Sequence, residues 1–593
     1  MSHRLSRWLF GFSLAALGAS GAVADSSTAL HALFDEEWNW RLEQSPELRT
    51  AVGIHDRDDQ LADTSLAAQT RRIGESHAFL ERLRAIDRAK LSAEDQINYD
   101  IFESQLFERD ESFRFGEHYL TLNADSGFHT GLPQMSQGMP AQSARDFDNY
   151  IARMRAVPRI FDEQIAIMRE GLRKGMTPPR VTLEGVEKTV EIQIVVDPTT
   201  SAFWKHLERI PDVVPPAEKA RLGAAAKSVI SEAVVPAYRR FYDFLVKEYL
   251  PGCRQTLAAG DLPDGKEYYR FLIRQYTTLP GQTAEAIHQL GLDEMKKIRA
   301  EMDEVIRQVG FKGSFAEFLT FLRTDPRFYP KTAEELIKEG SYIAKQMDGK
   351  LPMLIKTLPR KPYTVVPVPA HLAPKYTAGR AAGSPKDSPE PSYYWLNTYA
   401  LNTRPLYNLE ALTFHEAAPG HLIQGALSEE QEELPNFRRY SYISAYGEGW
   451  GLYSEWLGLE AGFYKDPYSN FGRLTYQAWR ACRLVVDTGV HALGWNRQQV
   501  MDYLAQNTAL SLHEVETETD RYISWPGQAL SYYTGYLKIR ELRAKAEREL
   551  GPDFDRREFH DAVLLVGAVP LPVLEKRIDR YIAEVKARPK TAG

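Results

Sequence analysis

Apolar side chains recur every three or four residues along most of this 593-residue chain, and this spacing constrains the fold more than any other feature. Segments such as SLAAQTRRIGESHAFLERLRAI and AEAIHQLGLDEMKKIRAEMDEVIRQVG place charged residues between the apolar ones, which is typical of amphipathic helices. Two short β-type runs, YTVVPVPAH and SYYWLNTYA, flank a loop rich in Gly, Pro and Ser. The pattern predicts a mainly α fold with a small β element.

Length and charge set further limits. A chain of this length is too long for one simple core. We predict an N-terminal helical region over residues 25–270 and a second helical region over residues 271–593, with both interwoven as one unit. The net charge of -7 and the isoelectric point near 6.1 argue against a nucleic-acid partner.

The N-terminus has the order of features found in secretory signal peptides. Arg4 and Arg7 precede an apolar run, and the small residues Ala22 and Ala24 follow it. We predict a signal peptide over residues 1–24, with a membrane anchor as the alternative. No other segment approaches about 20 apolar residues, and no cysteine follows the predicted cleavage point. We therefore expect a periplasmic or secreted protein without stable membrane insertion after cleavage.

The segment FHEAAPGHLIQ carries the strongest chemical signal. Its histidines, His415 and His421, are six residues apart, whereas residues on one face of a regular helix lie three or four apart. Pro419 removes a helical hydrogen bond and Gly420 relaxes the backbone, so we expect a distortion that turns both imidazoles to one side. Imidazoles suit a zinc ion, and Glu416 could act as general base. Two partly buried histidines at a helix break are the alternative.

A later helix supplies a candidate third ligand. Glu448 and Glu455 in AYGEGWGLYSEWLGLE are seven residues apart, so they share one helix face in a largely apolar segment. Burying a carboxylate without a partner is unfavourable, so we expect a cation beside this face. That cation is either a metal, with Glu448 as ligand, or an arginine in a salt bridge.

Four motifs in one order carry a family resemblance. FHEAAPGHLIQ, GEGWGLYSEWL, RLVVDTGVHALGW and WPGQALSY together resemble the bacterial family catalogued as domain of unknown function 885, which is grouped with zinc metallopeptidases. The resemblance implies one Zn2+ held by His415, His421 and Glu448, with Glu416 as general base. GEGWGLYSE also resembles the ligand helix of thimet-oligopeptidase-type and angiotensin-converting-enzyme-type peptidases, which implies a large helical fold with a deep cleft. The chain departs from those enzymes by the insertion at Pro419 and Gly420.

A polar stripe crosses the apolar helix in YQAWRACRLVVDTGVHALGW. Arg480, Arg483, Asp487 and His491 fall within a wedge of about 80°. We predict that Arg480 and Arg483 bind substrate, because an arginine fork matches the two oxygens of a peptide carboxylate; a structural salt-bridge network is the alternative. His491 is a candidate donor to a transition-state oxyanion, with plain structural use as the alternative.

Two tyrosines in WPGQALSYYTGYLKIREL face the same way at a spacing of four residues. Tyr532 resembles the oxyanion-stabilising tyrosine of the oligopeptidase-type enzymes, and a phenol O–H can stabilise a tetrahedral oxyanion. Tyr536 is a weaker, substrate-binding candidate, and an aromatic stripe in the core is the alternative. A further hypothesis is that substrate pairs with the strand predicted near residues 393–398.

These residues together predict an exported zinc-dependent hydrolase, with the metal site in the second helical region. The expected activity is cleavage of short peptides by zinc-activated water. A zinc hydrolase of a non-peptide amide or ester, and a non-catalytic periplasmic binding protein on the same scaffold, are the alternatives. The sequence leaves open both trimming of peptides from an end and internal cleavage, and it does not determine the oligomeric state.

Overall fold

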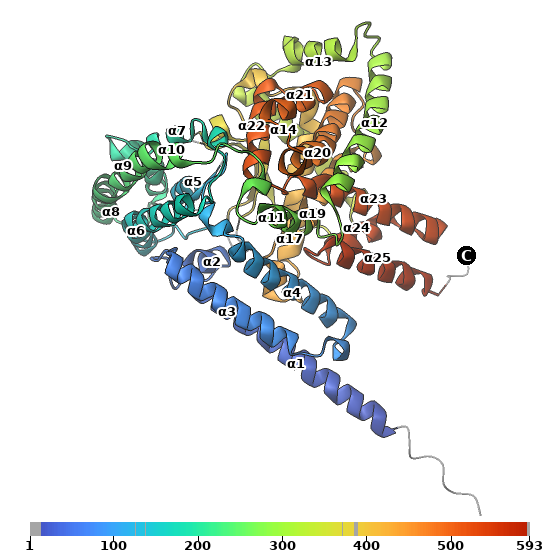
Figure 1. Ribbon diagram of the computed structural model, residues 1–593, viewed down its shortest axis with the longest axis horizontal. Coiled ribbons are helices and arrows are strands. Elements are labelled where there is room, and N and C mark those ends of the chain that lie inside the picture. The colour runs from blue at the N-terminus through green and yellow to red at the C-terminus, as the bar shows by residue number, and fades with distance from the viewer. Residues whose placement is uncertain (1–12, 125, 137, 371, 385–388, 590–593) are drawn as a thin grey trace, which may run out of the picture.

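The computed structural model describes residues 13–124, 126–136, 138–370, 372–384 and 389–589, with residues 13–25 and 375 described by their backbone alone. The chain is mainly helical, as the spacing of its apolar residues predicts (Figure 1). The predicted signal peptide falls partly outside the described residues, and its remainder begins the first helix. It stays a prediction. None of the described helices combines the length and hydrophobicity that a membrane span needs.

The first half of the chain forms two groups of helices. One comprises α1 (Ser13–Gln44), α2 (Pro46–Ala51), α3 (Leu66–Arg84) and α4 (Ala93–Arg114). The other comprises α5 (Phe128–Gly131), α6 (Ala144–Lys174), α7 (Val186–Glu191), α8 (Pro216–Val229), α9 (Val235–Phe244) and α10 (Leu250–Gly252). In Figure 1 the first group runs along the lower edge of the molecule, and the second group lies above it on the left side of the view.

The second half surrounds the long helix α20 (Pro467–Leu493). Before the sheet come α11 (Gly265–Thr277), α12 (Ala284–Gln308), α13 (Phe315–Thr324), α14 (Ala333–Asp348) and α15 (Leu351–Leu354). After it come α16 (Leu409–Glu416), α17 (His421–Glu429), α18 (Asn436–Arg439), α19 (Ser444–Glu460), α21 (Arg497–Asn507), α22 (Leu512–Ser524), α23 (Leu530–Leu550), α24 (Arg556–Leu564) and α25 (Leu571–Lys586). The helix α12 packs along α20, and α19 packs along α23.

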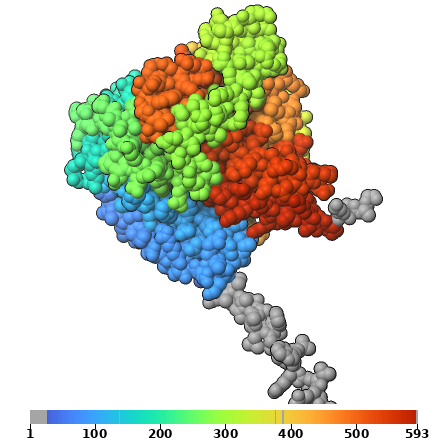
Figure 2. Space-filling model, turned by 45° about the vertical axis from the view of Figure 1, so that its right-hand side comes forward, coloured from blue at the N-terminus to red at the C-terminus, as the bar shows by residue number. Residues whose placement is uncertain are grey.

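Two large hydrophobic cores and one smaller cluster organise the described helices. The larger core contains residues from α1, α3 and α4 together with residues from α11 to α25, so the two ends of the chain share it. In Figure 2 the N-terminal helices lie directly against the C-terminal ones. A second core is built from residues between Leu122 and Cys253. The predicted division at residue 270 falls inside α11.

A small sheet lies between α15 and α16. Its strands are β1 (Tyr363–Pro367), β2 (Gly379–Ala382) and β3 (Ser392–Leu396), in the order β1-β3-β2. The central β3 pairs in parallel with β1 and antiparallel with β2. The hypothesis that substrate pairs with the strand near residues 393–398 is therefore wrong, because both edges of β3 are already used. The outer strands β1 and β2 each pair on one side only among the described strands, and β2 is the one that lines the cavity described below.

Candidate metal centre and its cavity

The helix breaks between the two histidines of the FHEAAPGHLIQ segment. The helix α16 ends at Glu416 and α17 begins at His421, so the residues between them form a sharp connection rather than a kink within one helix. A Cβ atom on Gly420 would lie 1.9 Å from the His415 carbonyl oxygen, so only glycine lets the chain turn this close to the end of α16. The Trp450 indole N–H donates to the Pro419 carbonyl at 2.8 Å and ties the break to α19.

The neighbouring helix α19 is shaped to receive the first imidazole. A Cβ atom on Gly451 would lie 2.7 Å from the His415 ring, so the ring packs directly against the backbone of α19. Glu448, one turn earlier on α19, reaches the same place. The GEGWG stretch therefore provides the Glu448 carboxylate, the Trp450 hydrogen bond to the helix break, and the close backbone contact of Gly451 with the His415 ring.

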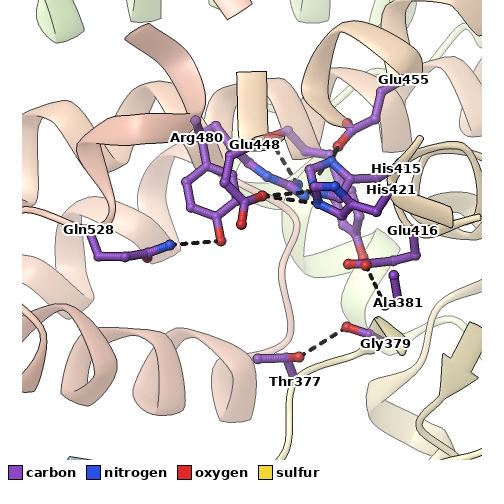
Figure 3. A network of polar contacts seen from close by, with 12 residues as sticks. Thr377, Gly379, Ala381, His415, Glu416, His421, Glu448, Glu455, Arg480 and Gln528 are labelled. Carbon is purple, nitrogen blue, oxygen red and sulfur yellow. Dashed lines mark hydrogen bonds and ion pairs between the residues drawn. The ribbon is translucent and has the colours of Figure 1, made fainter. Parts of the chain in front are cut away.

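His415, His421 and Glu448 bring three potential ligand atoms together (Figure 3). The Glu448 Oε2 atom lies 3.4 Å from His415 Nε2 and 3.2 Å from His421 Nε2. Bond lengths of 2.0–2.1 Å around a tetrahedral zinc ion place neighbouring ligands about 3.3 Å apart. Two imidazole nitrogens and one carboxylate oxygen are also a donor set that zinc accepts. The residues therefore fit a divalent metal of this kind.

His415 is held by a buried polar chain. Its Nδ1 atom lies 2.8 Å from Glu455 Oε1, and Arg480 Nη2 lies 3.2 Å from the same oxygen. Because a carboxylate only accepts, Nδ1 carries a proton toward Glu455, and Nε2 is the ring nitrogen that would lose its proton to bind a metal at the ligand cluster. Burial opposes the charged imidazolium, but hydrogen bonds to Glu448 and Glu455 outweigh it and raise the pKa of His415 to about 9. The centre thus attracts positive charge.

The candidate base Glu416 is fixed from the sheet. Its Oε2 atom accepts a hydrogen bond from the Ala381 backbone N–H of β2 at 2.8 Å, and the residue is 8% exposed. One oxygen is therefore held in place, and the other is left to the cavity. The link also places the open edge of β2 beside the histidines.

Tyr532 on α23 is positioned as a hydrogen-bond donor. Its oxygen accepts from Arg521 Nη2 at 3.1 Å and from Gln528 Nε2 at 3.4 Å. These two contacts occupy the oxygen and leave the hydroxyl hydrogen for another acceptor. The ring stacks on the His415 ring with centroids 6.2 Å apart, so the phenol lies beside the ligand cluster.

Tyr442 is a site residue that the sequence reasoning missed. It is 61% exposed, yet it reaches deep into the cavity, where the surrounding protein and a hydrogen bond to Glu448 raise the pKa of its phenol well above 10. It lies in the non-helical segment between α18 and α19. No helical or alternating spacing links it to Glu448, so no pattern in the sequence could have found it.

One cavity of about 900 Å3 connects these groups. The predicted site residues that line it are His415, Glu416, His421, Glu448, Arg480, Arg483 and Tyr532. Another part of the lining comes from α4 and α11. The cavity is thus lined by residues of both the N-terminal helices and the second half of the chain.

The two arginines of the predicted clamp are already engaged. Arg480 pairs with Glu455, and Arg483 pairs with Glu518 at 2.9 Å. The Arg483 guanidinium also lies 4.1 Å from the centre of the Tyr532 ring. Both arginines are nearly fully buried. Arg480 supports His415 through Glu455, and Arg483 packs against the ring of Tyr532. These contacts do not support the prediction that the two arginines bind a peptide carboxylate.

His491 and Tyr536 do not join the site. His491 Nδ1 accepts from the Ala259 backbone N–H at 3.0 Å, and Nε2 donates to the Tyr522 carbonyl at 2.9 Å. The Tyr536 hydroxyl accepts from Arg540 Nη1 at 2.7 Å. Neither side chain lines the cavity. Because their polar atoms are satisfied outside the cavity, the geometry favours the structural alternative for both residues.

Comparisons with known proteins agree with this fold. A crystal structure of a "putative lipoprotein" from Colwellia psychrerythraea superimposes with a TM-score of 0.88 at 28% identity, covering 94% of this chain and 99% of that one. A "putative lipoprotein of unknown function" from Shewanella oneidensis has a TM-score of 0.67 at 19% identity, covering 93% and 99%, and shows the fold alone. No curated protein matches. A family model matches residues 46–578, and the chain belongs to that family, described as bacterial protein of unknown function (DUF885).

Proposed function

We propose that this chain is a zinc-dependent hydrolase that cleaves short peptides. One observation carries the proposal: three convergent ligand atoms, a tethered carboxylate and a phenol line one cavity. His415, His421 and Glu448 would hold the metal. This combination of ligand set, base and hydrogen-bond donor is the one that metal-assisted hydrolysis of an amide requires.

Each residue has a distinct part in such a reaction. When bound, zinc supplies Lewis-acid activation that brings the pKa of a water molecule close to 7. Glu416 accepts the proton from the attacking water and returns it to the leaving amine. The Tyr532 O–H donates to the oxyanion that develops on the former carbonyl oxygen. Glu455 keeps His415 in the tautomer that ligation needs.

The open edge of β2 favours a peptide over another amide or ester. The Asn397 backbone N–H donates to the Ala378 carbonyl, so the alternate residues Gly379 and Ala381 direct their backbone groups away from β3. Both residues line the cavity. The Ala381 N–H is held by Glu416 and the Gly379 carbonyl accepts from the Thr377 hydroxyl. The Gly379 N–H and the Ala381 carbonyl are therefore the groups with which an extended peptide would pair. The volume of about 900 Å3 suits a short flexible chain and not a folded protein.

The decisive test is the Glu416→Gln variant, assayed for metal content and for hydrolysis of a random peptide pool by mass spectrometry. We expect stoichiometric zinc in both proteins and a fall in hydrolysis of about 10²- to 10⁴-fold in the variant. Glu410→Gln is the matched control, because Glu410 lies on the same helix α16 but bonds to Tyr464 and Ser469 outside the cavity.

Near-normal hydrolysis by Glu416→Gln would remove the general-base role. Purified protein without metal would reject the zinc centre. Zinc without cleavage of any peptide would leave the non-peptide hydrolase or the binding protein as the better description.

A further inference from the structure

The part of the cavity lining that α4 and α11 provide carries a carboxylate without an ion-pair partner among the described residues. Glu108 on α4 lines the cavity, and its Oε1 atom accepts from the Ser104 hydroxyl at 2.7 Å. Among the residues that the structure describes, no Lys, Arg or His lies within ion-pair distance of it. Burial raises the pKa of Glu108 to about 7, and Ser104 and the charge of Arg274 offset this only in part.

The arginines on the same wall are satisfied by another acid. Arg41 Nη2 lies 2.8 Å from a Glu37 oxygen, and Arg109 Nη1 lies 3.2 Å from the other. Arg109 also donates to the Ser76 hydroxyl. These cations are thus engaged by Glu37 and Ser76, and Glu108 faces the cavity without one of them.

A second acceptor on this wall lacks a donor. Gln275 on α11 lines the same cavity, and its buried Oε1 atom makes no hydrogen bond to any described residue. A buried acceptor without a donor is unfavourable by about 1–3 kcal/mol. Glu108 lies near enough to Arg274 and Tyr276, which flank Gln275, for their charges to interact. Glu108 and Gln275 therefore form one region of the lining that lacks both a hydrogen-bond donor for the amide oxygen and an ion-pair partner for the carboxylate. A ligand that fits must supply both.

We propose that the Glu108 end of the cavity binds the protonated primary amine of a substrate. An ammonium group brings three donors and one positive charge, which match the Glu108 carboxylate and the Gln275 oxygen. The free amino terminus of a short peptide is one source of this group, and a lysine side chain is the other. This inference rests on the proposed function, since it specifies which peptides the cavity selects.

An amine site in the same cavity as the candidate metal centre would also determine which peptide bond is cleaved. A peptide anchored by its amino end at Glu108 extends along the cavity toward Glu416. Cleavage would then occur at a fixed number of residues from the free amino terminus, and peptide bonds far from that terminus would be cleaved poorly. Blocking the amino group removes the anchor.

The experiment measures equilibrium binding of penta-alanine and of N-acetylated penta-alanine by calorimetry. It uses the full purified chain carrying Glu416→Gln, so that turnover does not consume the peptide. We expect the free peptide to bind about 10-fold or more tightly than the acetylated one, as a charge-assisted hydrogen bond allows. Adding Glu108→Gln should bring the ratio of the two dissociation constants, for the acetylated and the free peptide, close to one. Glu103→Gln is the matched control, because Glu103 lies on the same helix and pairs with Arg84 outside the cavity.

A third peptide separates the two sources of the amine. N-acetylated Ala-Ala-Lys-Ala-Ala should bind like the blocked peptide if the amino terminus is the ligand. If it binds tightly and loses this in Glu108→Gln, the lysine side chain is the ligand and the amine site still stands. A ratio that survives Glu108→Gln, or equal binding of all three peptides to the parent protein, would overturn the proposal.

The outcome is independent of the peptidase assignment. A protein that binds free amines through Glu108 but cleaves no peptide would keep this inference and reject the peptidase. A protein that cleaves free and blocked peptides equally well would keep the peptidase and reject the amine site.

Discussion

The two ends of the polar stripe on α20 differ in what they contact. At the cavity end, Arg480 and Arg483 lie behind the metal centre and reach it through Glu455 and Tyr532. At the far end, two turns later, Asp487 and His491 bind groups of α11, α22 and the adjoining loops. One helix face therefore borders the candidate metal centre at one end and supports the fold alone at the other.

This difference shows what a helical wheel can and cannot establish. The wheel places four polar residues on one side of the helix, and the structure agrees. It carries no information on where along the axis the cavity stops. The comparison predicts that changes at the cavity end alter metal binding or turnover, whereas changes at the far end alter stability alone.

The largest expected effect is on Tyr532, which Arg483 supports at the cavity end. Tyr532→Phe should lower kcat by about 10²- to 10³-fold, because an O–H donor to the oxyanion is lost, while metal content stays unchanged. Steady-state kinetics and metal analysis on the same preparations check this. Tyr536→Phe is the control, since it lies one turn away and outside the cavity. Equal losses in both variants would contradict the role of Tyr532.

The next effect concerns the chain from Arg480 to His415. Glu455→Gln should weaken zinc affinity about 10- to 100-fold, because the carboxylate no longer fixes the His415 tautomer. Competition with a chelator measures the affinity. Glu460→Gln is the matched control, because Glu460 lies on the same helix and pairs with Arg543 instead. Unchanged affinity in Glu455→Gln would show that His415 needs no support from the cavity end of α20.

The sequence sufficed for the parts of the centre that depend on local spacing. Pro419 and Gly420 predict a break in the helix, and the break is there. The seven-residue spacing of Glu448 and Glu455 predicts a shared helix face, and both side chains point toward the histidines. Only the structure shows that Glu448 lies among the potential metal ligands whereas Glu455 contacts Nδ1 of His415. The sequence could not distinguish them, because both glutamates lie on the same helix face.

Other parts of the cavity leave no trace in local spacing. The Ala381 N–H that holds Glu416 is a backbone group, so no residue type marks it. Glu108 comes from α4, about 300 residues before the histidines, and only the shared core of the two chain ends brings it close. Tyr442 lies in an irregular segment. These groups depend on tertiary packing, which periodicity does not encode.

At the far end of α20, His491→Phe should lower the free energy of unfolding by about 1–3 kcal/mol. The substitution leaves the Ala259 N–H and the Tyr522 carbonyl without their partner. Burial lowers the pKa of His491 to about 4, so the ring is neutral at pH 7 and no charge is lost. Thermal unfolding measures the change. Zinc affinity should stay at the wild-type value, and a marked loss of affinity would break the distinction between the two ends.

The last expected effect is a change in pH dependence at Asp487. Burial raises its pKa to about 7, and hydrogen bonds from Tyr269 and the Gly527 backbone N–H lower it only in part. The unfolded chain has a pKa near 3.9, so the folded state holds more protons between these values. The stability that this proton contributes is fully present below about pH 4 and is lost as the pH rises through 7.

Asp487→Asn should therefore flatten the decline in stability over this range, by at most about 1 kcal/mol per pH unit. Thermal midpoints of the two proteins from pH 4 to 8 provide the measurement. Burial also raises the pKa of Glu514 to about 7, but that group is present in both proteins and cancels in the difference. Parallel curves would mean that Asp487 is ionised throughout. The far end of α20 would then carry a buried charge, as the cavity end does with Arg480 and Arg483. The two ends would in that case differ less in their electrostatics than their contacts indicate.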